Sequence, residues 1–205
     1  MNKFLFFFFL FHFSNIHCQN FKGGFFAGIT SSQVSGDELG GFNKFGPSFG
    51  LFVKKHFDKY KFKVELLYTT KGSKRILNFN ELNNQNDFAY DSYTNYNFHL
   101  DYIGVPLIII LDLKKKFEIE LGTSFDFLIN QSEEIEYYID NSRKVKTLDL
   151  CIISGIKYLI NEKIDFNLRL SNSILPIRPH ASDQVYKLNM GQYNTTLNLS
   201  LHYNL

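Results

Sequence analysis

The sequence predicts an all-β fold: an eight-stranded antiparallel up-and-down transmembrane β-barrel with short periplasmic turns and long external loops. Three observations predict it. Apolar and polar residues alternate with a period of two along most of the chain, the connections between these segments alternate between short and long, and an export signal precedes them. No stretch shows convincing helical periodicity.

The composition excludes several other classes of protein. The chain has 205 residues, of which 44% are hydrophobic and 17% aromatic, with 23 Phe and no Trp. This length suits one domain. Lys and Arg total 22 against 20 Asp and Glu, which leaves no cationic surplus for binding nucleic acid. Two cysteines cannot form a disulfide framework or a four-cysteine zinc site.

The N-terminus predicts export. A basic start at Lys3 is followed by an apolar run, Phe4 to Phe13, and then by a polar stretch that ends at Cys18. This is the layout of a secretory signal, and the run is too short to cross a bilayer as a helix. We therefore expect residues 1–18 to be a signal peptide and residues 19–205 to be the barrel domain. A buried N-terminal strand is one alternative. Acylation of Cys18 is another, although His17 stands where lipoprotein signals place a small residue.

The first four strands follow in order. Residues 21–30 form a Gly-rich aromatic strand with Phe21, Phe25 and Ile29 on one face. Clean alternation then marks strands at residues 45–54 and 60–69. The fourth, residues 98–113, is apolar on both faces near its centre and contains Pro106. Because proline removes a ladder hydrogen bond, we expect a bulge or kink there.

Four more strands alternate as cleanly, at residues 117–130, 148–158, 164–171 and 192–205. Short turns are predicted at residues 56–59, 114–116 and 161–163. Long polar loops are predicted at about residues 33–44, 71–97, 131–146 and 172–189. A regular exchange of short and long connections is typical of an up-and-down barrel with its short turns at one rim.

The alternation alone fits both a barrel in water and a barrel in lipid. A soluble barrel such as a lipocalin turns its apolar face inward, whereas an outer-membrane barrel turns it toward lipid. Tyrosines on the apolar face near strand ends favour the membrane, because they would form an aromatic girdle. They are Tyr60, Tyr68, Tyr102, Tyr158, Tyr193 and Tyr203. The export signal and the amphipathic last strand point the same way, so we expect the outer membrane.

Several short motifs also resemble a known family. Lys22-Gly23-Gly24, the run from Val64 to Gly72, the run from Leu100 to Leu107, Glu120-Leu121-Gly122 and Gly155-Ile156-Lys157-Tyr158 occur in the order and spacing of one group of proteins. The chain thereby resembles the small outer-membrane β-barrel family of Bacteroidota-type bacteria, which includes the PorT-like proteins. The resemblance implies an eight-stranded outer-membrane barrel, and for most members no defined activity. Gly104 stands where the family usually has Glu, so an inward carboxylate is expected to be missing, and the chain ends in Leu205 rather than Phe.

The polar face predicts a filled lumen. An eight-stranded barrel is just wide enough for side chains to fill it, and charges buried there must be paired. We expect a polar network of Lys63, Glu65, Glu118, Glu120, Asp165 and Arg169. The full set of charged or titratable residues assigned to this face is Lys61, Lys63, Glu65, His99, Asp101, Glu118, Glu120, Asp126, Asp149, Lys157, Asp165 and Arg169.

No pattern predicts catalysis, a metal site or a cofactor. Glu118 and Glu120 are two apart on one face and could in principle do acid–base work, but a structural network is the better interpretation. Four histidines, His56, His99, His180 and His202, fall on separate elements without metal-binding spacing. Cys151 lies on the polar face and is interpreted as a packed thiol.

Binding is expected at the external loops, if anywhere. The longest of them carries Phe79, Phe88, Tyr90, Tyr93 and Tyr96 among amides, which could contact a saccharide or a protein. We expect a monomer in contact with outer-membrane lipid. Its role is either structural or mediated by these loops. The alternatives are a narrow pore and a lipocalin-like carrier of a small apolar ligand.

Overall fold

The structure, a computed structural model, describes residues 21–37, 39–75, 95–135, 138–140, 142–180 and 190–205. Nine strands occur in these residues, and eight of them are long. The strands are β1 (Phe21–Ser35), β2 (Lys44–His56), β3 (Lys61–Lys74), β4 (Tyr96–Lys114), β5 (Phe117–Ile135), β6 (Tyr138–Ile139), β7 (Leu148–Leu159), β8 (Ile164–Ser173) and β9 (Tyr193–Asn204). No helix in the described part of the chain is long and apolar enough to span a membrane.

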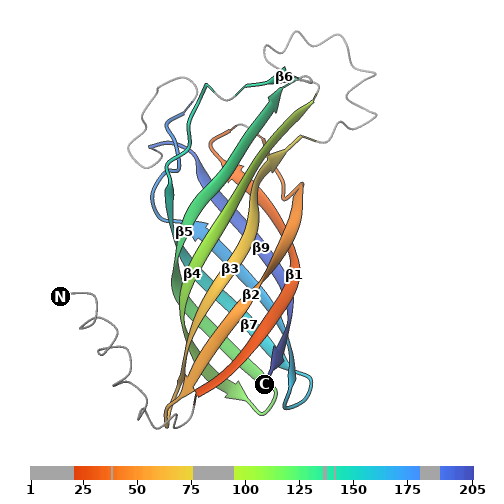
Figure 1. Ribbon diagram of the computed structural model, residues 1–205, viewed down its shortest axis with the longest axis vertical. Coiled ribbons are helices and arrows are strands. Elements are labelled where there is room, and N and C mark those ends of the chain that lie inside the picture. Colours follow the sequence, from red (N-terminus) through yellow and green to blue (C-terminus); the bar gives the residue numbers. More distant parts are fainter. Residues whose placement is uncertain (1–20, 38, 76–94, 136–137, 141, 181–189) are drawn as a thin grey trace, which may run out of the picture.

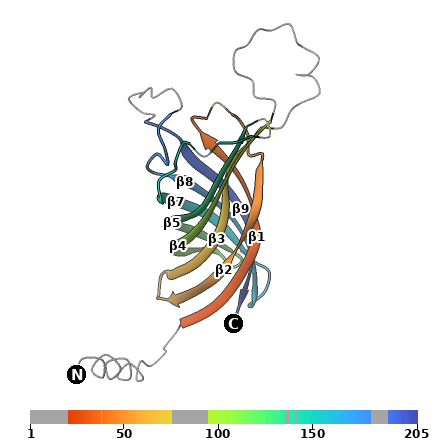
Figure 2. The same ribbon diagram turned by 45° about the horizontal axis from the view of Figure 1, so that its top comes forward.

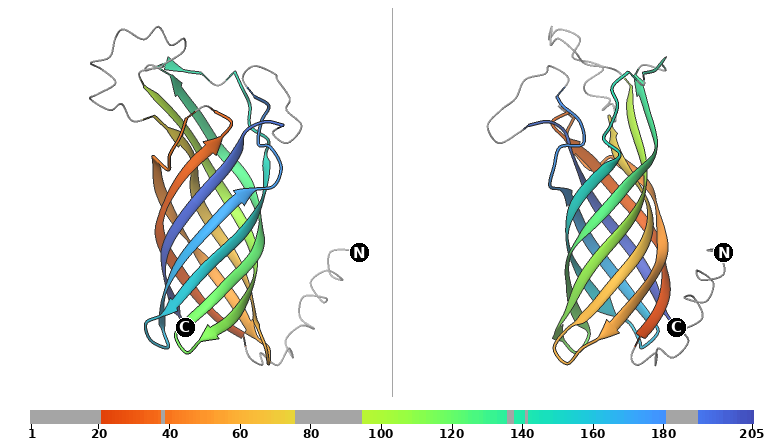
Figure 3. Two further views of the ribbon diagram at one scale, coloured as in Figure 1. Left: turned by 180° about the vertical axis from the view of Figure 1, so that it is seen from behind. Right: turned by 60° about the vertical axis from the view of Figure 1, so that its left-hand side comes forward.

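The eight long strands close into a barrel. Their order is β4-β3-β2-β1-β9-β8-β7-β5, each neighbouring pair is antiparallel, and pairing of β4 with β5 completes the ring. Figures 1 and 3 show the strands tilting around one common axis. The two-residue β6 pairs only with the far end of β5 and adds nothing to the wall. The predicted eight-stranded up-and-down barrel is therefore confirmed.

The two rims of the barrel differ. At one rim, here called the turn end, short connections join β2 to β3, β4 to β5 and β7 to β8, and β9 ends (Figure 1). The opposite rim, here called the loop end, carries the longer connections and is tipped toward the viewer in Figure 2. At the loop end, three strands are longer than the alternation predicted: β1 continues to Ser35, β3 to Lys74 and β5 to Ile135.

The wall has its apolar side chains outside. Phe45, Leu51 and Ile152 are 67%, 61% and 57% exposed, whereas Lys63 and Glu120 on the other face are fully buried. A water-soluble barrel would have the reverse arrangement, since burial of apolar surface is what stabilises it. This wall is suited to a surrounding of lipid.

Aromatic rings line the turn end of the wall. Phe25 stacks on Tyr203 with ring centroids 5.3 Å apart, and Phe117 packs on Tyr158 at 5.1 Å. In the turn between β2 and β3, Phe57 stacks on Tyr60 at 4.8 Å. Such pairs at the edge of an apolar wall match the girdle that membrane barrels place at the lipid–water interface.

The loop-end half of β4 departs from the predicted parity. Tyr102, assigned to the lipid-facing girdle, is fully buried inside the barrel. His99 and Asp101, assigned to the lumen, lie on the opposite face, where Asp101 accepts a hydrogen bond from the outward-facing Tyr68 (2.9 Å). Both assignments were wrong for one reason. Residues 98–102 do alternate, but their apolar members turn inward and pack in the lumen at the loop end, which reverses the rule that holds for the lipid-facing wall.

The expected irregularity at Pro106 is also absent. Pro106 faces Ser124 in an unbroken register with β5, and the register shifts lie instead at Asp101/Tyr102 and Asp112/Lys114. Bulges near the ends of a strand disturb fewer ladder hydrogen bonds than one at its centre, and they are common at barrel rims.

Candidate functional site in the barrel lumen

Ion pairs fill the lumen near the turn end. The Lys63 ammonium lies 2.5 Å from Glu120 Oε1 and 2.8 Å from Glu65 Oε1, and all three side chains are fully buried. These residues stand on β3 and β5, which are not adjacent, so the contact between Lys63 and Glu120 crosses the interior. Charges removed from water in this way are stable only when paired and hydrogen-bonded.

Arg169 on β8 joins the far wall to this group. Its Nη1 and Nη2 donate to the two carboxylate oxygens of Glu65 at 2.8 and 2.9 Å, and Nη2 also donates to Glu120 at 2.9 Å. A two-point contact between guanidinium and carboxylate is strong and fixes orientation. Because β8 and β3 lie apart in the ring, these contacts carry the Arg169 side chain across the lumen.

Glu118 and Asp165 complete the set at the turn end. Lys61 donates to Glu118 at 2.5 Å, and Lys157 lies 3.9 Å from Glu118 and 3.5 Å from Asp165. The structure thus brings together all six residues that the sequence placed in one polar network. All six lie on strands with strict apolar–polar alternation, which predicts most directly which side chains face inward.

Neutral polar residues that the sequence analysis did not single out support this network. Asn167 donates to Glu120 at 2.7 Å, and Asn204 donates to Asp165 at 2.9 Å. Both had the inward parity, but an amide gives no charge signal. We name the group made by Lys61, Lys63, Glu65, Glu118, Glu120, Lys157, Asp165 and Arg169 the lower network.

A second charged cluster lies nearer the loop end. Lys71 donates from Nζ to Asp126 Oδ2 at 2.6 Å, to Asp149 Oδ2 at 2.9 Å and to the Cys151 sulfur at 3.3 Å. The sequence had assigned Lys71 to a loop, because β3 was expected to end before it. Cys151 is buried in the lumen, as its parity suggested.

This cluster is also the one group in the described residues with spacing suited to a metal ion. Ligand atoms of Asp126, Asp149 and Cys151 lie within 4.8 Å of one another. The ammonium of Lys71 already bonds to all three side chains, so the protein's own cation occupies the position that a metal would take. The ion pairs with Lys71 neutralise the two carboxylates of this cluster.

Gly104 on β4 leaves space for the carboxyl group of Asp126 on β5. Gly104 faces Asp126 across β4 and β5, and the carboxyl group of Asp126 lies where a Cβ on residue 104 would stand. From the family resemblance we expected an inward carboxylate to be missing at position 104. Asp126 on the next strand supplies a carboxylate at this place.

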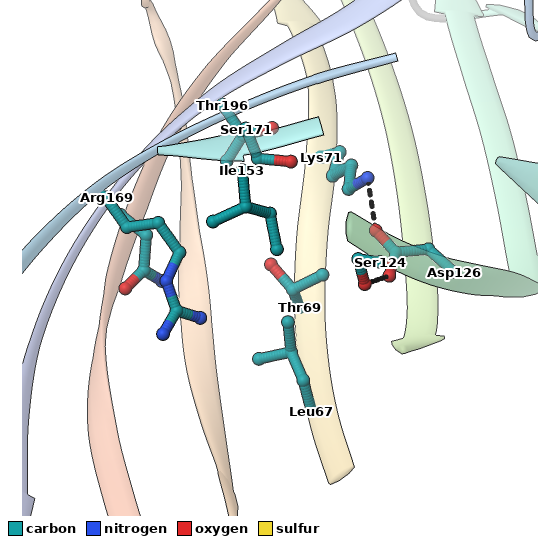
Figure 4. A pocket seen from close by; sticks show the side chains of 10 residues that line it. Leu67, Thr69, Lys71, Ser124, Asp126, Ile153, Arg169, Ser171 and Thr196 are labelled. Carbon is teal, nitrogen blue, oxygen red and sulfur yellow. Dashed lines mark hydrogen bonds and ion pairs between the residues drawn. The ribbon is translucent and has the colours of Figure 1, made fainter. Parts of the chain in front are cut away.

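A small cavity separates the two charged clusters. Figure 4 shows it between Arg169 on one side and the Lys71–Asp126 pair on the other. Its volume is about 30 Å³, enough for one or two water molecules. A cavity of this size is too small for an organic ligand.

Aromatic and aliphatic side chains close the lumen at the loop end. Phe98, Leu100 and Tyr102, inward on β4, are fully buried against residues of β1 and of two loop-end connections. We call this cluster the outer plug; its members are Val34, Tyr96, Phe98, Leu100, Tyr102, Val145 and Ile177, together with Arg178.

Arg178 fixes the connection between β8 and β9 over the plug. Its guanidinium donates to both oxygens of Glu133 at 2.5 and 2.8 Å and lies 4.1 Å from the centroid of the Phe98 ring. Burial lowers its pKa, but the hydrogen bond and charge of Glu133 outweigh burial, so the pKa of Arg178 is raised. Sequence reasoning missed Arg178, since nothing in a polar loop marks a residue that folds inward.

Of the five aromatic residues proposed for partner binding, the structure describes one. Phe79, Phe88, Tyr90 and Tyr93 lie outside the described residues. Tyr96 is 7% exposed in the outer plug, and its hydroxyl donates to Glu133 at 2.7 Å. Tyr96 is therefore part of the closure of the lumen and does not face the surroundings.

Comparisons with known proteins agree with this geometry. The family of the outer membrane protein beta-barrel domain matches residues 13–177. Neisserial surface protein A is similar in structure, with a TM-score of 0.54 and 14% identity over 89% of this chain and 97% of that one. Ail of Yersinia pestis, solved in complex with the heparin analogue sucrose octasulfate, gives a TM-score of 0.50 and 10% identity over 91% and 99%. Among curated proteins, none matches the sequence.

Proposed function

Because this chain belongs to the outer membrane protein beta-barrel domain family, we propose that it is a closed outer-membrane scaffold that presents external loops to a partner. The turn end then faces the periplasm and the loop end faces outward. The observation that carries the proposal is the occupied lumen: Arg169 spans it within the lower network, and the outer plug closes it above.

The filled lumen favours this role over transport. A pore needs a continuous polar path, yet Lys63 and Arg169 both pair with Glu120 across the interior. A lipocalin-like carrier needs an apolar cavity, whereas the cavity here is small and lined in part by charged groups. Both alternatives would require the ion pairs to separate, which is costly for buried charges.

The proposal includes no catalytic step. The carboxylates that could exchange protons, Glu118 and Glu120 among them, are held in ion pairs inside the wall. A substrate would have to displace those partners before it could reach them. A structural role is the better account of such groups.

Loop-mediated binding is the remaining part of the proposal. A rigid barrel holds its loops at fixed positions, which favours recognition by loop residues. Phe79, Phe88, Tyr90 and Tyr93 supply aromatic surface next to amides, a combination suited to saccharides and to protein surfaces. Sucrose octasulfate is a useful first probe, because the similarly folded Ail was solved with it.

The test compares two loop variants in detergent by calorimetry against sucrose octasulfate and a panel of neutral and sulfated oligosaccharides. One variant replaces the four aromatics Phe79, Phe88, Tyr90 and Tyr93 by alanine. The control replaces two exposed neutral residues of another loop-end connection, Ser142 and Thr147, by alanine. We expect the first to lose binding and the control to keep it. Equal binding by the aromatic variant would contradict loop-mediated recognition.

We also propose the finer placement among small barrels of Bacteroidota-type bacteria, with removal of residues 1–18 on export and a monomeric mature protein. The order of the motifs from Lys22 to Tyr158 supports the placement. Mass spectrometry of protein purified from outer membranes tests the cleavage. A mature chain that begins at Gln19 is expected, and a retained or acylated Cys18 would contradict it.

A further inference from the structure

Lysine side chains surround the turn end of the barrel. Each of the three short connections carries at least one, and another stands at the start of β1. They are Lys22, Lys55, Lys59, Lys114, Lys115, Lys116 and Lys163, all exposed except the partly buried Lys55. We call this set the basic rim. Carboxylates at the same level are fewer: Asp58, Asp112 and Glu162, of which Asp112 is paired with Lys61 at 2.6 Å.

The basic rim lies directly beside the aromatic edge of the apolar wall. The Lys55 ammonium lies 5.3 Å from the centroid of Phe21 and 5.2 Å from that of Phe57. The Lys116 ammonium lies 5.9 Å from that of Tyr158. Long cationic side chains at such an edge bury their methylenes on apolar surface and keep the ammonium at the interface.

The loop end has no comparable excess of cations among its described residues. Exposed or partly exposed cations there are Lys74, Arg75, Arg143, Lys144 and Lys146, but Asp37, Glu134 and Asp140 stand at the same rim, and Arg178 is paired with Glu133. Among the described residues, the excess of cations over carboxylates is therefore larger at the turn end than at the loop end. Because lysines occur in every short connection, they form a ring around the barrel rather than a patch on one side.

We propose that the basic rim binds the headgroups of anionic phospholipids in the periplasmic leaflet. A ring of ammonium groups at the edge of an apolar wall lies at the level of lipid phosphates on all sides of the barrel. This electrostatic contact complements the aromatic girdle and fixes the height of the barrel in the bilayer. It is independent of what the external loops bind.

The test measures the preference of the full-length barrel for spin-labelled phosphatidylglycerol over spin-labelled phosphatidylcholine in phosphatidylcholine vesicles. The turn-end variant is K114Q/K115Q/K116Q. The matched control, K74Q/K144Q/K146Q, removes the same charge at the loop end. A gel that separates folded from heat-unfolded barrel verifies that each protein is folded before measurement.

We expect wild-type protein to prefer phosphatidylglycerol by about twofold or more at low salt, and to lose most of that preference at high salt. The turn-end variant should lose a large part of the preference, because it removes three of the seven lysines of the basic rim, while the control should keep it. Three results would overturn the proposal: no preference in the wild type, an equal loss in both variants, or binding of wild type to isolated peptidoglycan without any lipid preference.

Discussion

The carboxyl group of Asp126 occupies the space that a side chain on Gly104 would need, since the two residues face each other across β4 and β5. The same carboxyl is held by Lys71 at 2.6 Å. A glycine on one strand and an aspartate on the next thus act as one unit, which places an inward carboxylate beside Gly104.

Replacing Gly104 by alanine should destabilise the barrel by about 1–3 kcal/mol, because the added methyl group must displace Asp126 from Lys71. Gly23→Ala is the control, since a Cβ there meets only the Phe52 carbonyl at an ordinary 3.6 Å. The midpoint of unfolding, followed by the gel shift between folded and heated protein, measures both.

A transfer of the carboxylate tests the pairing more closely. The double variant G104E/D126G moves the acidic group to β4, where the resembling family carries it. We expect stability to recover relative to Gly104→Glu alone. Additive losses in the double variant would show that the two positions are independent.

Removing the Lys71 cation should be more damaging. Lys71→Met leaves Asp126 and Asp149 buried together without their partner, which typically costs about 3–5 kcal/mol. Lys74→Met, on the same strand but exposed, should change little. Adding Asp126→Asn and Asp149→Asn to Lys71→Met should restore part of the loss. If Lys71→Met matched Lys74→Met in a denaturant titration, the cluster would not stabilise the barrel.

Arg178 is expected to hold the loop-end connections closed. Arg178→Met removes both hydrogen bonds to Glu133 and the contact with Phe98, so the segment that carries Ile177 should open more often. Lys146 donates its backbone N–H to Ile177 and should be released with it. Trypsin should then cleave after Lys144 and Lys146 several-fold faster in intact vesicles. Unchanged cleavage rates would contradict this role, with the exposed Lys74→Met as the control.

Stability should depend on pH through Asp37, at the loop end. Burial raises its pKa above the ordinary 3.8, although hydrogen bonds from Ser73 and Leu39 oppose the shift. A raised folded-state pKa means that the folded state holds the proton longer, so stability falls as the pH rises from 3.8 through the folded-state pKa. Asp37→Asn should therefore gain stability over wild type across that window and keep the gain at pH 7.

Asp140 serves as the control for Asp37, because its pKa is shifted in the opposite direction. A hydrogen bond from the Ser142 backbone lowers the pKa of the exposed Asp140. Asp140→Asn should lose a little stability relative to wild type above pH 4. Denaturant titrations between pH 3 and pH 7 measure both differences, and a flat difference for Asp37→Asn would contradict its burial.

The sequence predicted the barrel and the lower network because both depend on parity. Lys63, Glu65, Glu120 and Arg169 stand on strands with one apolar and one polar face, so their direction follows from the pattern. At the loop-end part of β4 the contrast is reversed, with the apolar side chains inside, so Tyr102 and Asp101 were assigned to the wrong faces.

The closure of the loop end could not be predicted in the same way. Arg178 and Ile177 belong to a connection without periodicity, and their burial depends on Phe98 and Glu133, which lie far away in the sequence. Lys71 was missed because the length of β3 is set by pairing with β4 as far as Lys74, not by its own residues.

The measurement that tests the closed scaffold most directly is single-channel conductance of the full-length protein in planar bilayers. A porin of known conductance serves as the positive control for insertion, and protease protection of the same vesicles verifies that the barrel is folded. Since Arg169 bonds across the lumen to Glu65 and Glu120, and the outer plug covers the loop end, we predict no discrete current steps at moderate voltage. Reproducible steps from folded wild-type protein would contradict the account.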